Sequence, residues 1–134
     1  MKQSSSKAIT SSNAPTPVGP YSQAILAGEW IYCSGQIALD PKTGKMVGNG
    51  NVIAETQQVL LNLVSVLEAA GASSADVVKT TIYLKDLSDF EKVNNIYAST
   101  FKNAVTPARA CVEVAELPKG GKVEIDCVAW IGGA

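Results

Sequence analysis

Apolar residues between positions 52 and 70 recur three, four or seven places apart, which puts them on one face of a helix. The stripe consists of Val52, Val59, Leu60, Leu63, Leu67 and Ala70. Asn51 precedes the stripe and is suited to accept hydrogen bonds from the first backbone N–H groups of a helix. Gly71 follows it and is suited to end the helix. We therefore predict a helix over residues 52–70.

A second helix is predicted near residue 88. The tetrapeptide from Ser88 to Glu91 has the pattern of a capping box, in which two side chains satisfy the first free N–H groups of a helix. An apolar stripe follows at the matching spacing, on Phe90, Val93, Tyr97 and Phe101. Pro107 prevents this helix from continuing.

Shorter runs rich in β-branched and aromatic residues predict strands, with Gly- or Pro-containing turns between several of them. These runs cover residues 21–26, 30–34, 77–84, 110–115 and 122–131. The predicted order is β-β-α-β-α-β-β, an α+β architecture in which one sheet carries two helices on one face. The chain of 134 residues fits a single domain spanning residues 1–134. Its Ser- and Pro-rich start, residues 1–18, is expected to be a flexible tail.

The last predicted strand alternates between two kinds of side chain. One side carries the apolar residues Val123, Ile125, Cys127 and Ala129, which suit packing under the helices. The other side carries Glu124, Asp126, Val128 and Trp130. Carboxylates mixed with Val and Trp make a poor solvent surface, so we expect the face opposite the helices to be an interface between subunits.

The composition excludes several classes of function. Because the chain has no histidine, Ser-His-Asp and Cys-His catalysis and His-ligated metal sites are impossible. The formal net charge of -1 argues against a broad basic surface for nucleic acid or for an anionic membrane. No run approaches the roughly 20 apolar residues that span a bilayer, and the start lacks the apolar run of a secretory signal. A cytoplasmic location is expected, with an organelle transit peptide as the alternative.

The three cysteines are widely spaced and show no metal-ligand pattern, so we expect reduced, buried thiols. Cys111 has no histidine to activate it as a nucleophile. The pair Gly120-Gly121 lacks the surroundings of a nucleotide-binding loop. The sequence therefore predicts neither a metal nor an organic cofactor.

Arg109, Glu124 and Tyr21 are the candidates for chemistry. Arg109 is the single arginine, so it alone could grip a carboxylate with two parallel hydrogen bonds, although the pattern by itself favours an exposed or salt-bridged arginine. Glu124 could hold a water and exchange protons with a substrate nitrogen, or could simply lie on the polar side of a strand. Tyr21 follows the stiff pair Gly19-Pro20 and could pack or donate a hydrogen bond. Gly35 would let a ligand approach the backbone closely.

These segments together resemble the RidA family, also called the YjgF-type or L-PSP family, and within it the RidA subfamily. The motifs that carry the resemblance are GPYSQA (19–24), SGQI (34–37), VKTT (78–81), KDL (85–87), PARACVEV (107–114), LPK (117–119) and VEI (123–125). The resemblance covers nearly the whole chain, and PARACVEV is its most specific part.

The resemblance implies a chorismate-mutase-like fold and a homotrimer with clefts between subunits. It also implies hydrolysis of 2-aminoacrylate and related enamines and imines, such as 2-iminobutanoate and 2-iminopropanoate, to 2-keto acids and ammonia without a cofactor. Arg109 matches the arginine that holds the substrate carboxylate, and Glu124 the glutamate that positions water. Further cleft positions are matched by Tyr21, Ser34, Gly35, Asn94 and Cys111.

Two other functions stay open at this point. The first is an endoribonuclease or translation inhibitor, which the absence of histidine, the single arginine and the acidic pI of about 5.4 do not favour. The second is a trimer that binds ligands or acts like a chaperone without catalysis. Ammonia release from 2-aminoacrylate would separate an enzyme from a binding protein.

Overall fold

The computed structural model describes residues 6–102 and 105–133. The strands are β1 (Ser6–Ile9), β2 (Ala24–Ala27), β3 (Trp30–Gln36), β4 (Val77–Leu84), β5 (Ala108–Glu113) and β6 (Val123–Trp130). The helices are α1 (Val52–Ala69) and α2 (Phe90–Thr100), and short 3-10 turns cover Ser74–Asp76, Leu87–Asp89 and Pro118–Gly120. None of the helices in the described ranges is long and apolar enough to cross a membrane.

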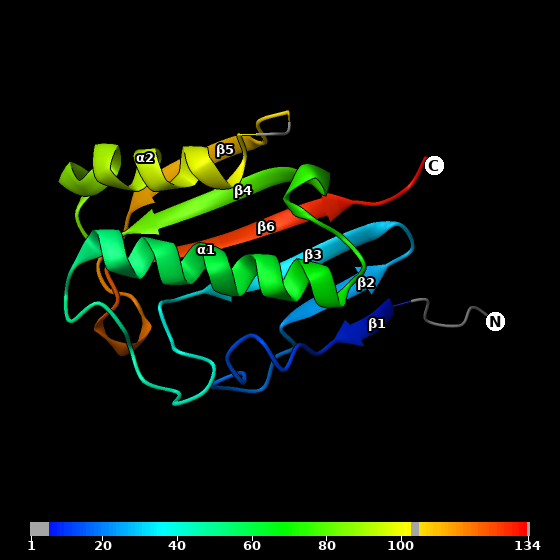
Figure 1. Ribbon diagram of the computed structural model, residues 1–134, viewed down its shortest axis with the longest axis horizontal. Coiled ribbons are helices and arrows are strands. Elements are labelled where there is room, and N and C mark those ends of the chain that lie inside the picture. Colours follow the sequence, from blue (N-terminus) through cyan, green and yellow to red (C-terminus); the bar gives the residue numbers. More distant parts are fainter. Residues whose placement is uncertain (1–5, 103–104, 134) are drawn as a thin grey trace.

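The six strands form one sheet in the order β1-β2-β3-β6-β4-β5. All neighbouring strands are antiparallel except β4 and β5, which are parallel. Both helices lie against the same face of the sheet, and β5 forms one edge beneath α2 (Figure 1). The predicted α+β class, with two helices on one face, is confirmed.

The core lies between this helix-covered face and the two helices. On β6 it contains Val123, Ile125, Cys127 and Ala129, none of them more than 2% exposed, as the alternation predicted. Glu124, Asp126 and Val128 point to the opposite face and are half-buried, while Trp130 is exposed. We call this second side of the sheet the open face, because no helix covers it.

The structure corrects the predicted start of the chain. Residues 6–9, expected to belong to a flexible tail, form β1 and pair with β2, which adds a strand to the predicted order. The pattern Ser-Lys-Ala-Ile is too short to signal a strand by itself, so its pairing with β2 decides its conformation. Residues 1–5 of the expected tail lie outside the described residues.

One of the two predicted helix starts is confirmed and one is wrong. The Asn51 side chain accepts the N–H groups of Ile53 and Ala54 at 2.9 and 3.1 Å, so it caps α1 as predicted. Ser88 does not cap α2, because it lies inside a 3-10 turn that is capped by Asp86. The helix then begins at Phe90 without a side-chain cap.

Candidate active site

Arg109 lies at the exposed edge of the sheet, where α2 determines its surroundings. It sits directly across from Thr80 in the parallel β4–β5 pair, so its side chain points to the helix-covered face. Its Nη1 donates to the Oδ1 of Asn94 at 2.7 Å. The guanidinium carbon lies 5.4 Å from the ring centre of Phe90 and 5.0 Å from that of Tyr97, within the range of cation–π attraction.

The sequence of α2 produces this arrangement. Phe90, Asn94 and Tyr97 are four and three residues apart, so they share one face of the helix. Tyr97 is buried, and its hydroxyl forms a 2.7 Å hydrogen bond with that of Thr80, which fixes α2 over β4. Two rings and an amide therefore orient the guanidinium. Among the described residues Asn94 is its one hydrogen-bond partner, so its other N–H groups are suited to bind a carboxylate.

Glu124 lies on the open face of β6, across from Tyr83 of β4. Burial raises the pKa of the Glu124 carboxyl above its ordinary value, and the nearby carboxylate of Asp126 raises it further. The Tyr83 hydroxyl donates to Asp126 at 3.0 Å, which holds this second carboxylate in place. A carboxylate whose pKa is raised toward neutrality is suited to accept and return a proton.

Gly35 gives Glu124 its position. A Cβ at residue 35 would lie 2.8 Å from the Cδ of Glu124, well inside van der Waals contact. The β3–β6 register shifts between Cys33 and Gln36, so Gly35 lies where the strand is irregular. The sequence predicted that this glycine admits a ligand to the backbone, whereas the structure fills the space with the Glu124 side chain.

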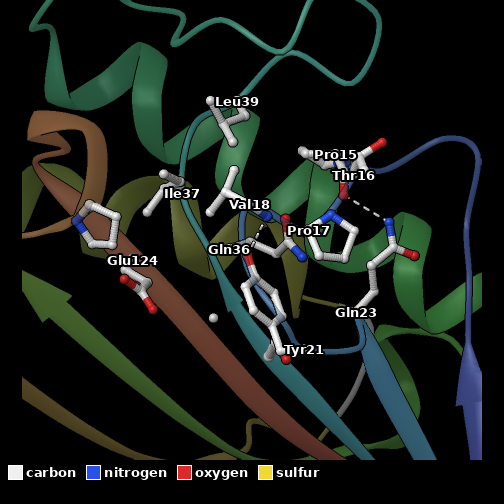
Figure 2. A pocket seen from close by; sticks show the side chains of 13 residues that line it. Pro15, Thr16, Pro17, Val18, Tyr21, Gln23, Gln36, Ile37, Leu39 and Glu124 are labelled. Atoms are coloured by element: carbon white, nitrogen blue, oxygen red, sulfur yellow. Dashed lines mark hydrogen bonds between the residues drawn. The ribbon is translucent and has the colours of Figure 1, made fainter.

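Tyr21, Ser34 and Glu124 line one pocket of about 320 Å³. Figure 2 shows Tyr21 and Glu124 among its lining side chains. The Tyr21 hydroxyl accepts the N–H of Val18 at 3.2 Å, and a phenol that accepts one bond can still donate its own proton. The Ser34 hydroxyl donates to the carbonyl of Ser22 at 2.7 Å, which ties β3 to the segment before β2.

The predicted site residues fall into two groups within one chain. Glu124, Tyr21, Ser34 and Gly35 line the pocket just described, whereas Arg109 and Asn94 line a separate hollow of about 470 Å³. The first pocket involves the open face, and Arg109 points to the helix-covered face. Because the sheet separates the two side chains, Arg109 and Glu124 cannot act on one small molecule within a single chain.

Cys111 belongs to neither group. It is half-buried against the core, and this burial raises the pKa of its thiol. A raised pKa leaves little thiolate, which does not favour a nucleophile. The other two thiols, Cys33 and Cys127, are buried, and the described residues contain no group of three His, Cys, Asp or Glu side chains that could hold a metal ion.

Sequence reasoning missed the parts that Phe90, Tyr97 and Asp126 play in this geometry. The two aromatic residues were assigned to a packing stripe, which is correct for Tyr97, but Phe90 is exposed and lies over Arg109. The signal was available in part, since an aromatic residue seven positions from another shares its helix face. Nothing along the chain indicates which strand faces that helix.

Comparison with known proteins identifies the family of this chain. The family model for endoribonuclease L-PSP matches residues 11–131. A RutC family protein of Synechocystis is 55% identical over 123 residues, covering 92% of this chain and 95% of the relative. The human protein named 2-iminobutanoate/2-iminopropanoate deaminase is 48% identical over 126 residues, covering 94% and 90%. The crystal structure of the Escherichia coli YjgF gene product superposes with a TM-score of 0.88 at 46% identity, covering 92% and 98%. The chain therefore belongs to the endoribonuclease L-PSP family, the YjgF-type family that its motifs resemble.

Proposed function

We propose that this protein hydrolyses 2-imino acids to 2-keto acids and ammonia in a cleft built by two copies of the chain. The human relative and a Salmonella typhimurium relative, each 48% identical, carry the name 2-iminobutanoate/2-iminopropanoate deaminase. The observation that carries the proposal is the separation of Arg109 and Glu124 onto opposite faces of the sheet. Each chain then carries both halves of a site but holds them apart. A complete site therefore takes one half from each of two chains.

Arg109 binds the substrate in this mechanism. Two parallel, charge-assisted hydrogen bonds between a guanidinium and a carboxylate fix both the position and the orientation of a 2-imino acid. The rings of Phe90 and Tyr97 and the amide of Asn94 hold the guanidinium before substrate arrives. The carbon of the C=N bond therefore occupies a defined place in the cleft.

Glu124 moves the protons. It accepts a proton from a water molecule while the water oxygen forms a bond to the electrophilic carbon of the protonated imine. The electrons of the C=N π bond move to nitrogen, which gives a carbinolamine. Glu124 returns its proton to that nitrogen. The C–N bond then breaks as the hydroxyl oxygen forms the C=O bond, and Glu124 passes the hydroxyl proton to the departing ammonia, so that the 2-keto acid and ammonium are released. The carboxylate ends unchanged, which is what a catalyst requires.

The open face and β5 are the surfaces on which we propose the copies meet. Trp30, Tyr32, Val112 and Trp130 of the open face are each 40% or more exposed. Five of the six β5 residues are exposed. Because β5 pairs in parallel with β4, and parallel strands are normally covered on both faces, this exposure suits a surface that another copy covers. We propose a homotrimer, in which the Arg109 half of one copy faces the Glu124 half of the next.

Mixing two inactive variants tests both the activity and the shared cleft. Arg109→Ala and Glu124→Gln are each expected to abolish ammonia release from 2-iminopropanoate above the spontaneous rate. When the two variants are unfolded and refolded together in equal amounts, about one quarter of the clefts in a random trimer receive both intact residues. Recovery of about one quarter of wild-type turnover supports the proposal. No recovery, with assembled trimers in the mixture, contradicts the shared cleft.

The name of the family raises RNA cleavage as a rival activity, which the same variants address. The chain has no histidine and a net charge of -1, so we propose that nucleic acid is not its substrate. RNA cleavage that persists in an Arg109→Ala, Glu124→Gln double variant, purified free of nuclease, would contradict this.

A further inference from the structure

Glu55 is a buried acidic residue that the proposed chemistry does not use. It lies in the first turn of α1, is 2% exposed, and is the one charged side chain among the buried residues that the structure describes. Withdrawing a carboxylate from water is costly unless hydrogen bonds replace the lost hydration. A buried carboxylate therefore needs a partner, and Glu55 has one outside its own helix.

The Glu55 carboxylate holds the backbone at the point where the chain enters β6. Its Oε1 accepts the N–H of Lys122 at 2.8 Å. The carbonyl of Lys122 accepts the N–H of Lys85 at 3.0 Å, so the peptide groups on both sides of Lys122 are fixed. In Figure 1 the start of α1 and the turn before β6 lie at the same end of the sheet. Glu55 joins these two elements.

Two glycines let the chain close around this carboxylate. A Cβ at residue 48 would lie 3.1 Å from the Cγ of Glu55, and a Cβ at residue 121 would lie 3.8 Å from its Oε1. Gly48 also has a φ of +90°, a conformation that other residues rarely adopt. The loop before α1 and the turn before β6 therefore both pack against the Glu55 side chain.

The turn that Glu55 holds belongs to the Glu124 pocket. Pro118 in this turn lines the pocket together with Glu124. Lys119, the next residue, has a φ of 59°, in the left-handed region that favours glycine. Such a backbone persists only when the surrounding contacts hold it. Lys122 is two residues before Glu124, so a shift of Lys122 also moves the strand that carries the reacting carboxylate.

We propose that Glu55 is a positioning residue, which sets the places of Pro118 and Glu124 in the pocket through its hydrogen bond to Lys122. The inference rests on the proposed function. Within residues 6–102 and 105–133 Glu55 forms no salt bridge, so its role requires an accepting oxygen rather than a negative charge. A neutral side chain of the same shape that can accept the bond is expected to replace it.

Glu55→Met tests the positioning role, because it keeps the length of the side chain and removes both oxygens. Glu124 is then less well placed, and kcat for 2-iminopropanoate is expected to fall by at least about tenfold, since a displacement of about 1 Å costs about a hundredfold. KM should stay within about threefold, because Arg109 of the other copy still binds the substrate carboxylate. Wild-type kcat in Glu55→Met would overturn the proposal. If this variant does not assemble, Glu55→Ala is judged by the same outcomes.

Glu55→Gln separates the hydrogen bond from the charge. The amide oxygen can accept the same N–H, so kcat is expected to stay within about threefold of wild type even where the melting temperature falls. A loss of kcat as large as that in Glu55→Met would overturn the claim that the accepting oxygen is what matters.

Thr56→Val is the matched control for stability. It removes a buried polar group from the adjacent position of α1, where the Thr56 hydroxyl donates to the carbonyl of Val52 at 2.7 Å. We expect a lower melting temperature and an unchanged kcat. A fall in kcat equal to that of Glu55→Met would show that destabilising α1 explains the effect, and would overturn the positioning role.

Hydrogen exchange of the Lys122 amide tests the contact without an activity assay. In Glu55→Met this amide is expected to exchange at least about tenfold faster relative to the amide of Ile125, in the middle of β6, whereas Glu55→Gln keeps the wild-type ratio. Comparing two amides isolates local opening, because a loss of global stability speeds both. An unchanged ratio in Glu55→Met would overturn the proposal.

Failure of this inference and failure of the proposed function give different results. If the wild-type protein does not hydrolyse 2-iminopropanoate above the spontaneous rate, the proposed deaminase activity is wrong, and exchange of the Lys122 amide still tests the contact. If the wild-type protein is active and Glu55→Met keeps its kcat, the activity is supported and the positioning role of Glu55 is wrong.

Discussion

Gly35→Ala is the sharpest perturbation of the proposed mechanism, because it adds one methyl group and changes no charge. The new Cβ would lie 2.8 Å from the Cδ of Glu124, whereas nonbonded carbon atoms keep about 3.5 Å apart. Because the Oε2 of Glu124 lies closer still to the new Cβ, the carboxylate must retreat by about 1 Å or more, or β3 must move away from β6 by as much. Gly35 does not have a positive φ, so the backbone itself accepts alanine without strain.

A displacement of about 1 Å at a reacting group costs about a hundredfold in rate, so we expect kcat to fall by about 10- to 100-fold. The assay is ammonia release from 2-iminopropanoate, with the melting temperature and the oligomeric state measured on the same samples. The matched control is Gly19→Ala, since a Cβ at residue 19 meets only the Tyr21 ring, at 3.5 Å, which is an ordinary contact. That variant should keep its activity.

The shorter carboxylate of Glu124→Asp offers a rescue. On its own this substitution withdraws the carboxylate from the water and lowers kcat. In the Gly35→Ala background it removes the overlap, so the two losses should not add. Wild-type kcat in Gly35→Ala, with the protein folded and assembled, would refute the argument that Gly35 places Glu124.

Three further outcomes follow from the site. Arg109→Lys keeps the charge but loses the two-pronged geometry, and we expect kcat/KM for 2-iminopropanoate to fall by about a hundredfold with an unchanged melting temperature. Asp126→Asn removes a negative charge that raises the pKa of Glu124, so the pKa of Glu124 falls in this variant. Because the basic form of Glu124 is the active one, the acid limb of the pH profile of kcat/KM should move to lower pH. An acid limb that does not move would contradict the role of Glu124. Cys111→Ser should keep kcat within about threefold, whereas complete loss would indicate a covalent thiol intermediate.

The sequence alone was sufficient wherever one periodic pattern decided the structure. The stripe of α1 with Asn51 before it produced the observed helix, and β4 has the predicted bounds of residues 77–84. The alternation in β6 correctly separated Val123 and Ile125 from Glu124 and Asp126, because successive side chains of a strand point to opposite faces. These features depend on neighbours along the chain.

The tertiary structure decided everything that depends on which strands become neighbours. It paired residues 6–9 with β2, and it placed the Glu124 carboxylate over Gly35, a contact that joins residues 89 positions apart. It also put Arg109 and Glu124 on opposite faces. Alternation along a strand shows which of its residues share a face of the sheet. Only the pairing of β4 with β5 and with β6 shows whether a residue of β5 and a residue of β6 lie on the same face. The sequence therefore named the candidate groups, and the sheet placed them on opposite faces of one chain, which is why we propose that they act from different copies.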